Sequence, residues 1–285
     1  MRKLIILFSL VLFVASCKKD SVTLVPAVVD VKPATYLNVS YGSDAVQKMD
    51  VYLPGGRTVA TTKTIVIIHG GAWLDGDKAD MTFVVDSITK RSPNFAMINI
   101  NYRLAVYGVS NLFPTQELDV KAAIDFYLTK SIEYLVSKDL IVLGASAGAH
   151  LALLHAYKND PDKHVKAVID FFGPTDLVAI WNQGYYQQIA LMAAIGAAYT
   201  DNQAIYTQSS PINYVTAQSP PTIALQGLVD DIVLPVQSTT LVDKLNMAGV
   251  SNQLVTYPNE GHGFSDAANT DALNKILPFL AKYVK

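Results

Sequence analysis

One stretch, residues 141–153, constrains this chain most, because it reads IVLGASAGAHLAL. The apolar run at 140–143 is typical of a buried parallel strand, and the Ala- and Leu-rich run after position 146 predicts a helix. Between them lies a G-x-S-x-G pattern centred on Ser146. So sharp a reversal requires small residues at 144 and 148 and strains the backbone of the serine. We therefore predict that Ser146 is a nucleophile with its hydroxyl at the top of a sheet. The alternative is a small-residue turn that only packs a helix on a strand.

Strand patterns in the rest of the chain predict a sheet around this stretch. Residues 35–41 and 47–53 alternate apolar and polar positions about a Gly-Ser-Asp turn, which predicts an N-terminal hairpin. Further strands are expected at 64–68, 95–102, 140–143, 165–172, 222–226 and 253–257. Helices are expected at 81–90 with Asp80 as its cap, at 114–128, after 146, around 241–247, and from 266 to the end. We therefore expect one α/β domain at 35–285, with an eight-stranded, mostly parallel sheet covered by helices on both faces.

A nucleophilic serine needs a base to take its proton. Of the five histidines, His262 lies between two glycines just after the last predicted strand, where a loop can bring an imidazole close to another backbone. We therefore predict His262 as the base. The other four are expected to pack or to face solvent: His69, His150, His155 and His164.

The base needs a carboxylate, which should lie between serine and histidine in the chain. Asp230 and Asp231 follow the predicted strand 222–226 directly, and Asp176 is a more distant alternative. Asp230, three residues past Gly227, is the preferred candidate.

Attack on a carbonyl creates an oxyanion that needs backbone N–H donors. The amide of Ala147 is one candidate donor. Gly70 and Gly71, which follow the strand at 64–68, are the others.

Residues 176–211 form the one long irregular section, rich in Trp, Tyr, Gln and Ala. They are expected to form a small cap-like insertion that shapes the substrate site, or a pair of ordinary surface helices. Trp73, Tyr102 and Trp181 are candidate substrate-binding residues, with Tyr185 and Tyr186 as further aromatic candidates. Each of these aromatic side chains has core packing as its alternative.

Several motifs together resemble the α/β-hydrolase fold, more narrowly the bacterial carboxylesterases related to hormone-sensitive lipase and to the acetyl and feruloyl esterases of polysaccharide breakdown. The motifs that carry the resemblance are DVYLP at 50–54, HGGAW at 69–73, NYRL at 101–104, GASAG at 144–148, GPTDL at 173–177 and GHGF at 261–264. The resemblance covers nearly everything from Tyr36 onward. It implies an esterase with a Ser146–His262–Asp230 triad that acts on a short-chain or aryl acyl ester, plausibly on an acylated carbohydrate.

The chain departs from this family at two places. Gln226 stands before Gly227, where the family commonly has a histidine, and we expect it to be structural. An extra residue, Leu234, separates Val233 from Pro235 and leaves the choice between Asp230 and Asp231 open.

Other functions on the same framework stay open. A formamidase shares the triad and a similar HGG loop. A peptidase of the prolyl-oligopeptidase kind usually carries a large N-terminal propeller, for which the lead before Tyr36 leaves no room. A non-catalytic glycan-binding lipoprotein is the alternative from another class. No cysteine cluster, H-E-x-x-H or phosphate loop indicates a metal or cofactor. The near-neutral net charge of −2 argues against a nucleic-acid partner, and the oligomeric state is left open.

The N-terminal residues predict where the protein is located in the cell, and they are not expected to form part of the folded domain. Two basic residues, an apolar run and small residues are typical of a signal peptide at 1–16. Residues 14–17 (VASC) resemble the lipobox of bacterial lipoproteins, which implies lipidation of Cys17, the only cysteine, and a flexible tether at 17–34. We therefore expect a lipid-anchored protein of the bacterial cell envelope, with an ordinary signal peptide as the alternative.

Overall fold

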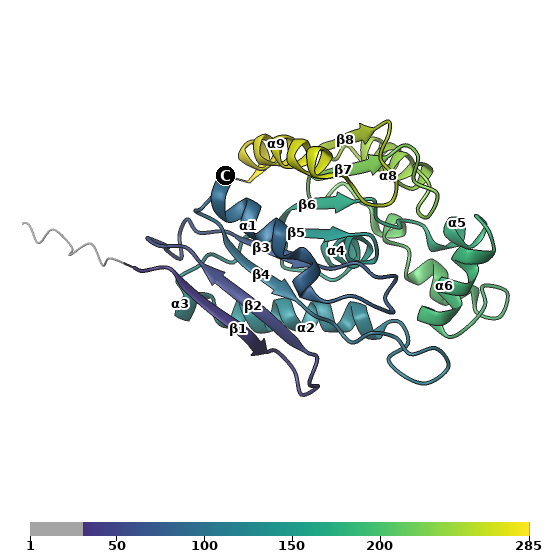
Figure 1. Ribbon diagram of the computed structural model, residues 1–285, viewed down its shortest axis with the longest axis horizontal. Helices are drawn as coiled ribbons and strands as arrows, with labels where there is room; N and C mark the ends of the chain where they lie inside the picture. Colours follow the sequence, from purple (N-terminus) through teal and green to yellow (C-terminus); the bar gives the residue numbers. More distant parts are fainter. Residues whose placement is uncertain (1–30, 285) are drawn as a thin grey trace, which may run out of the picture. The chain divides into compact units, whose positions relative to one another are not determined.

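The computed structural model describes residues 31–284, which are built around an eight-stranded sheet (Figure 1). The strand order is β1-β2-β4-β3-β5-β6-β7-β8. The β1/β2 and β2/β4 pairs are antiparallel and the other five are parallel. The bounds are Ala34–Ser40 for β1, Lys48–Leu53 for β2, Thr64–Ile68 for β3, Ala96–Ile100 for β4, Leu140–Ala145 for β5, Val165–Phe171 for β6, Thr222–Gly227 for β7 and Asn252–Tyr257 for β8. The predicted eight-stranded, mostly parallel sheet is confirmed.

Helices cover both faces of this sheet, as expected from the continuous apolar strands. Every residue of β3 and of β4 is buried, because neither face of a central parallel strand meets water. The principal helices are α1 (Thr82–Arg91), α2 (Thr115–Thr129), α4 (Ala147–Lys158), α8 (Val236–Met247) and α9 (Asp266–Tyr283), and the short α3 spans Ser131–Tyr134.

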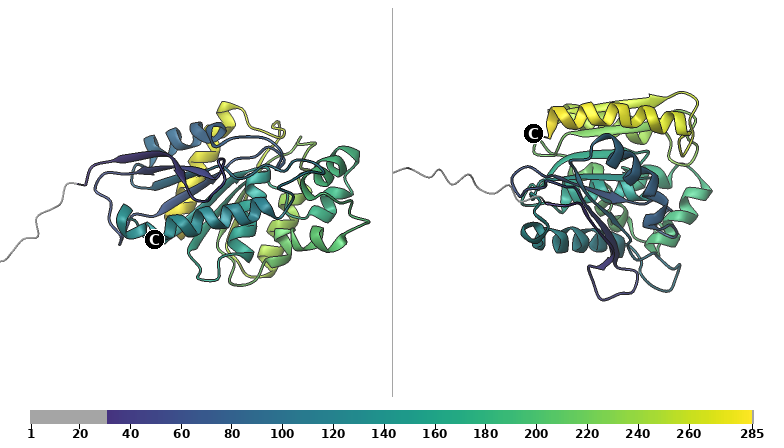
Figure 2. Two further views of the ribbon diagram at one scale, coloured as in Figure 1. Left: turned by 90° about the horizontal axis from the view of Figure 1, so that it is seen from below. Right: turned by 60° about the vertical axis from the view of Figure 1, so that its left-hand side comes forward.

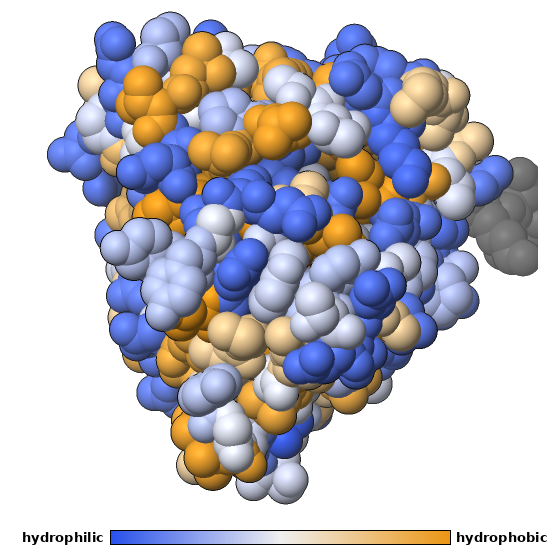
Figure 3. All heavy atoms as spheres, turned by 90° about the vertical axis from the view of Figure 1, so that its right-hand side faces the viewer, coloured by the Kyte–Doolittle hydropathy of each residue, from blue (hydrophilic) through white to orange (hydrophobic). Residues whose placement is uncertain are grey.

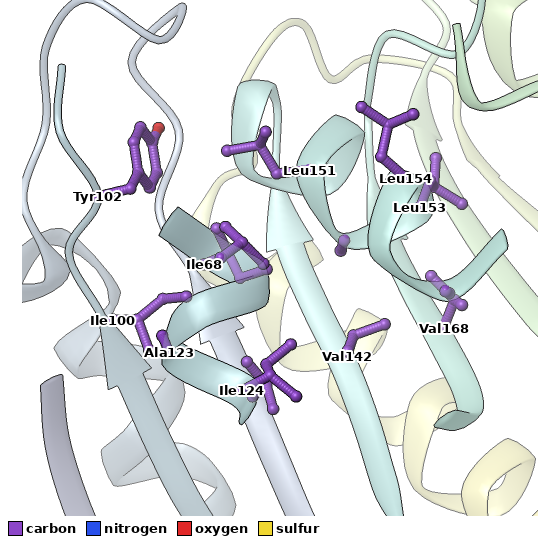
Figure 4. Close-up of a cluster of buried hydrophobic side chains, with 14 of the residues drawn as sticks. Ile68, Ile100, Tyr102, Ala123, Ile124, Val142, Leu151, Leu153, Leu154 and Val168 are labelled. Carbon is purple, nitrogen blue, oxygen red and sulfur yellow. The ribbon is translucent and has the colours of Figure 1, made fainter. Parts of the chain in front are cut away.

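Alternate residues of one strand face different helices. Ile65 and Ile67 of β3 belong to the core formed with α1 and α9. Val66 and Ile68 belong to the core formed with α2, α4 and α8. The layers are visible in Figure 2, and Figure 4 shows Ile68 and Val142 among side chains of α2 and α4. Both faces of the sheet are therefore packed against helices.

The start of the first helical segment differs from the prediction. Asp77, not Asp80, is the cap: its carboxylate accepts the N–H of Ala79, and the Asp80 side chain accepts the N–H of Asp77. A short 3-10 turn, η1 (Lys78–Met81), follows before α1 begins. The apolar spacing located the helix correctly, but the reciprocal cap placed its start three residues earlier.

The irregular section after β6 folds into short helices beyond the carboxyl ends of the parallel strands, where Figure 1 shows α5 and α6. They are α5 (Leu177–Trp181), α6 (Tyr185–Ile195), α7 (Gln203–Gln208) and the 3-10 turn η2 (Pro211–Tyr214). Figure 3 looks onto this end and shows apolar side chains at the surface between polar ones.

The predicted signal peptide, Cys17 and most of the predicted tether lie outside the described residues. Within residues 31–284, no helix is long and apolar enough to cross a bilayer.

Candidate active site

Ser146 sits at the turn between β5 and α4 in a strained backbone conformation. Its φ is 54° and its ψ −123°, a region that L residues seldom adopt and that costs on the order of 1–3 kcal/mol. Its N–H donates to the carbonyl of Phe171 at 2.9 Å, which fixes the turn against β6. The sharp, strained turn expected from the G-x-S-x-G pattern is therefore present at Ser146.

The glycines that flank this turn have no room for a side chain. A Cβ at Gly144 would lie 2.3 Å from the backbone of Gly148. A Cβ at Gly148 would lie 2.2 Å from the carbonyl oxygen of Ile68. Helix α4 can therefore begin directly over the end of β3 only because both positions lack side chains.

The structure brings Ser146, His262 and Asp230 into one hydrogen-bonded chain. Nε2 of His262 lies 2.8 Å from Oγ of Ser146, and Nδ1 lies 2.8 Å from Oδ2 of Asp230. A carboxylate only accepts, so Nδ1 carries the proton and Nε2 is free to accept the serine hydroxyl. The three residues come from the ends of β5, β7 and β8, which are far apart in sequence.

Backbone contacts hold the Asp230 and His262 loops together. The N–H of Val229 donates to the carbonyl of Glu260 at 3.1 Å. An isolated bridge between Gly261 and Gly263 tightens the turn that presents His262. The histidine ring also packs edge-on against Phe172, with 4.9 Å between the ring centroids.

Asp230 is almost fully buried, yet its surroundings favour the ionised form. Burial alone would raise its pKa, but hydrogen bonds from His262 and from the amides of Ile232 and Val233 outweigh that effect and hold the pKa below its usual value. Gln226 donates from Nε2 to Asp230 Oδ2 at 3.2 Å, and its Oε1 accepts the Ser238 hydroxyl. The expectation that Gln226 is structural agrees with these contacts.

The two alternative carboxylates are placed differently. Asp231 is exposed, and its backbone carbonyl accepts a hydrogen bond from Gln187. Asp176 caps α5 by accepting the N–H groups of Val178 and Ala179. Neither side chain is hydrogen-bonded to His262 in the described part of the chain, whereas Asp230 is, so the geometry favours Asp230.

The loop after β3 lies against the serine turn. A Cβ at Gly70 would meet the carbonyl oxygen of Ala145 at 2.9 Å, so this glycine is required for the close approach. Gly71, Ala72 and Trp73 all have positive φ. The amide of Ala147 belongs to the first turn of α4, where N–H groups lack intrahelical acceptors. The loop and the helix start therefore both bring backbone amides to the vicinity of Ser146.

The aromatic candidates separate into three different environments. Trp73 is buried and lines a cavity beside Ser146. Tyr102 follows the core-packing alternative: it is buried beneath the loop, where its ring stacks on His69 and its hydroxyl donates to the carbonyls of His69 and Gly70. Trp181 packs against Tyr199 and Tyr206 and is absent from the cavity lining. Periodicity could not reveal which way these rings point.

Two hollows flank Ser146. A cavity of about 380 Å³ has a mostly apolar lining that includes Trp73, Ile180 and Leu191. A more open groove of about 510 Å³ is lined by Gly70, Gly71 and His262. Several residues that line these hollows were not singled out by the sequence as substrate-binding candidates, among them Ile180, Gln187 and Ile232. For Gln187 and Ile232, no local pattern marks a wall formed by the meeting of α6 with the loop after β7.

The sequence and the fold of this chain have counterparts among known proteins. The model of the BD-FAE family matches residues 49–245. This chain belongs to the BD-FAE family. The match includes Ser146 and Asp230 and ends before His262, which the folded geometry supplies.

Among the similar proteins, one curated relative is named an esterase and one solved structure a carbohydrate esterase. This chain is 28% identical to Esterase LipC of Mycobacterium tuberculosis over 255 residues, covering 81% of this chain and 61% of that one. It is 27% identical, with a TM-score of 0.75, to a bifunctional GH43-CE protein of Bacteroides eggerthii, covering 87% of this chain and 38% of that one. A truncated carbohydrate esterase from gut microbiota has a TM-score of 0.73 at 24% identity, covering 88% of this chain and 98% of that one. The chain thus spans less than two thirds of LipC, and the expected α/β-hydrolase fold of the carboxylesterases is confirmed.

Proposed function

We propose that this protein is a serine carboxylesterase that works through Ser146, His262 and Asp230. The observation that carries the proposal is the continuous hydrogen-bonded chain from Asp230 through His262 to Ser146, at the mouth of an apolar cavity. The BD-FAE match and the esterase names of the relatives support the same reaction class. A non-catalytic, glycan-binding site would need neither the hydrogen-bonded chain from Asp230 to Ser146 nor the strained backbone of Ser146.

The proposed reaction has two halves. His262 Nε2 takes the proton of Ser146 as Oγ attacks the ester carbonyl, and Asp230 stabilises the imidazolium. Backbone amides of Gly70, Gly71 and Ala147 are proposed to bind the oxyanion. His262 then protonates the leaving alcohol, which gives a serine acyl-enzyme. Water attacks the acyl-enzyme with the same proton transfers, releases the acid and restores Ser146.

The positions of the two hollows suggest which side of the ester each one binds. The group that leaves must receive a proton from His262 Nε2, and His262 lines the more open groove but not the cavity beside Trp73. We therefore propose that the alcohol binds in the more open groove and the acyl group in the cavity. An apolar space of about 380 Å³ suits an acyl group larger than acetyl.

The proposed substrate is an acylated carbohydrate or another short-chain or aryl ester. One structural relative is named a carbohydrate esterase and another a GH43-CE protein, and both names support this class. An open groove on the alcohol side also accommodates a bulky alcohol. Formamide hydrolysis uses the same triad, so the discriminating measurement compares acetyl, butyryl and feruloyl esters, acetylated xylan, and an aryl formamide on the same protein.

The direct test replaces the nucleophile. In Ser146→Ala, p-nitrophenyl butyrate turnover should fall on the order of 10⁴-fold or more, because no covalent intermediate forms. Labelling by a fluorophosphonate probe should disappear with it. Labelling and turnover retained in Ser146→Ala would refute the assignment.

A further inference from the structure

His150 is a fully buried histidine with two polar partners, and the proposed reaction does not use it. It lies on α4, one turn after Ser146, and its backbone N–H donates to the carbonyl of Ser146 at 3.1 Å. Its ring is 2.7 Å, at Nε2, from the carbonyl oxygen of Ser209. At Nδ1 it is 3.2 Å from the indole Nε1 of Trp73.

These partners fix the tautomer of His150. A carbonyl only accepts, so Nε2 carries the proton and donates to Ser209. The indole N–H only donates, so Nδ1 must be unprotonated and accept from Trp73. Burial lowers the pKa of His150 to about 4, which keeps the ring neutral and this arrangement intact at ordinary pH. The ring is thus oriented by the segment between α7 and η2 and in turn orients the indole.

Trp73 connects this contact to the proposed site. Its ring is edge-on to His150 with 5.1 Å between centroids, and it forms part of the wall of the apolar cavity beside Ser146. Its backbone continues the strained run Gly71–Ala72–Trp73, all at positive φ. Because non-glycine residues at positive φ persist only where their surroundings over-determine them, the anchored indole helps to hold this loop.

We propose that His150 is a positioning residue that acts through Trp73: by accepting the indole N–H, it sets the cavity wall that selects the acyl group and steadies the loop that carries Gly71 and Ala72. This inference rests on the proposed esterase function. It makes His150 a determinant of acyl selectivity, although the His150 side chain does not contact the reacting atoms.

A neighbouring histidine offers a matched control for simple packing. His155 lies farther along α4, is also buried, and burial likewise lowers its pKa to about 4. Its Nδ1 has no hydrogen-bond partner in the described part of the chain, and it does not line the cavity. Replacing His155 therefore removes a buried imidazole from the same helix without touching Trp73.

The kinetic test compares acetyl and butyryl esters of p-nitrophenol. His150→Leu leaves the indole N–H without an acceptor, and we expect the butyryl-to-acetyl ratio of kcat/KM to change about tenfold. His150→Asn, which restores an acceptor near Nδ1, should recover most of the ratio, and His155→Leu should keep the wild-type ratio. Trp73→Phe should shift the ratio as His150→Leu does, and the double variant should shift it no further.

Two outcomes would overturn the proposal. One is an unchanged butyryl-to-acetyl ratio in His150→Leu. The other is an equal change in His155→Leu, which would show that loss of any buried imidazole from α4 has the same effect. If His150→Leu fails to fold, Trp73→Phe decides the question, because an unchanged butyryl-to-acetyl ratio in that variant would contradict a role for the indole N–H that His150 accepts.

A second readout does not depend on esterase activity. The chain has two tryptophans, so Trp181→Phe leaves Trp73 as the only one. In that background, His150→Leu should shift the Trp73 emission to shorter wavelength, because the indole N–H loses its acceptor, while His155→Leu should leave it unchanged. Absence of the shift refutes the positioning contact. A wild-type protein that cleaves no ester would instead refute the proposed function while the emission still reports on His150.

Discussion

Asp230 illustrates how the surroundings of a single residue distinguish two adjacent aspartates. Its Oδ1 accepts two backbone N–H groups and its Oδ2 accepts from His262, whereas Asp231 is exposed. Asp230→Asn should reduce kcat on the order of 10⁴-fold, because the amide no longer favours the tautomer in which Nε2 accepts the serine proton. Asp231→Asn should stay within a few-fold of wild type. Steady-state kinetics on p-nitrophenyl butyrate make the comparison, and a crippled Asp231→Asn beside an active Asp230→Asn would reverse the assignment.

Asp170 on β6 is a buried carboxylate whose protonation couples stability to pH. Burial raises its pKa to about 7 from 3.8, only partly offset by the N–H of Gly173, and Oδ2 has no hydrogen-bond partner among the described residues. Between about pH 4 and 7 the folded protein therefore holds a proton that the unfolded chain has lost. Stability should fall as the pH rises through this window, by up to about 4 kcal/mol above it.

Asp170→Asn removes this titration and keeps an oxygen to accept the N–H of Gly173. At pH 8 the variant should be more stable than wild type by a few kcal/mol, and at pH 5 the two should be nearly equal. Urea unfolding at both pH values measures the difference. A difference independent of pH would show that Asp170 does not titrate in this range.

The sequence located the candidate catalytic residues more reliably than it predicted which way the aromatic side chains point. Ser146 and His262 carry local signals, namely small flanking residues that permit a sharp turn. Tyr102 carries none: an aromatic residue after a strand can face a cavity or the core, and here it supports the loop from below. Gln187 and Ile232 were missed because their role arises only where two distant segments meet.

At the scale of elements, the contact between α4 and β3 decides where the serine turn sits. A Cβ at position 148 would lie 2.2 Å from the carbonyl of Ile68 and 2.4 Å from that of His69. Gly148→Ala should therefore push α4 off the sheet and lower stability by about 3 kcal/mol or more. Thermal unfolding and the yield of soluble protein are the measurements.

Gly249→Ala is the matched control for this prediction. Gly249 follows α8 at φ +71° with nothing within 4 Å of a built Cβ, so only backbone strain of about 1 kcal/mol applies. Equal losses in the two variants would show that crowding at position 148 is not the cause.

Strands were more predictable than helix starts. All eight strands were located, from alternating apolar and polar residues in the N-terminal hairpin and from continuous apolar runs at central strands such as 64–68 and 140–143. The start of the helical segment at Lys78 depends on a reciprocal cap between Asp77 and Asp80, and two aspartates in one turn allow either to be the cap. The pairing of β2 with β4 ahead of β3 is a long-range choice that no local pattern contains.

Across the whole molecule, the residues of the candidate site and the helices that only stabilise the fold lie at different parts of the sheet. Its carboxyl ends carry Ser146, Asp230 and the loop of His262, while α6 and the loop after β7 close the cavity from the far side. Helices α1 and α9 pack against the core on the other face of the sheet, which contains Ile65 and Ile67. Under the proposed function, substitutions on α6 should therefore change which acyl group is accepted and leave the hydrogen bonds among Ser146, His262 and Asp230 in place.

The proposed lipid anchor on Cys17 would place this site at a membrane surface, because the lipobox-like VASC precedes residues that are not expected to join the domain. One acyl chain binds membranes only marginally, whereas two or more anchor a protein stably. In a host that processes lipoproteins, the wild type should therefore partition into the detergent phase of Triton X-114, and Cys17→Ala should partition into the aqueous phase. Ester turnover by the solubilised wild type and by the variant should be equal, since the triad lies wholly within residues 146–262. Mass spectrometry that finds an unmodified Cys17 in the mature protein would exclude the anchor and favour an ordinary signal peptide.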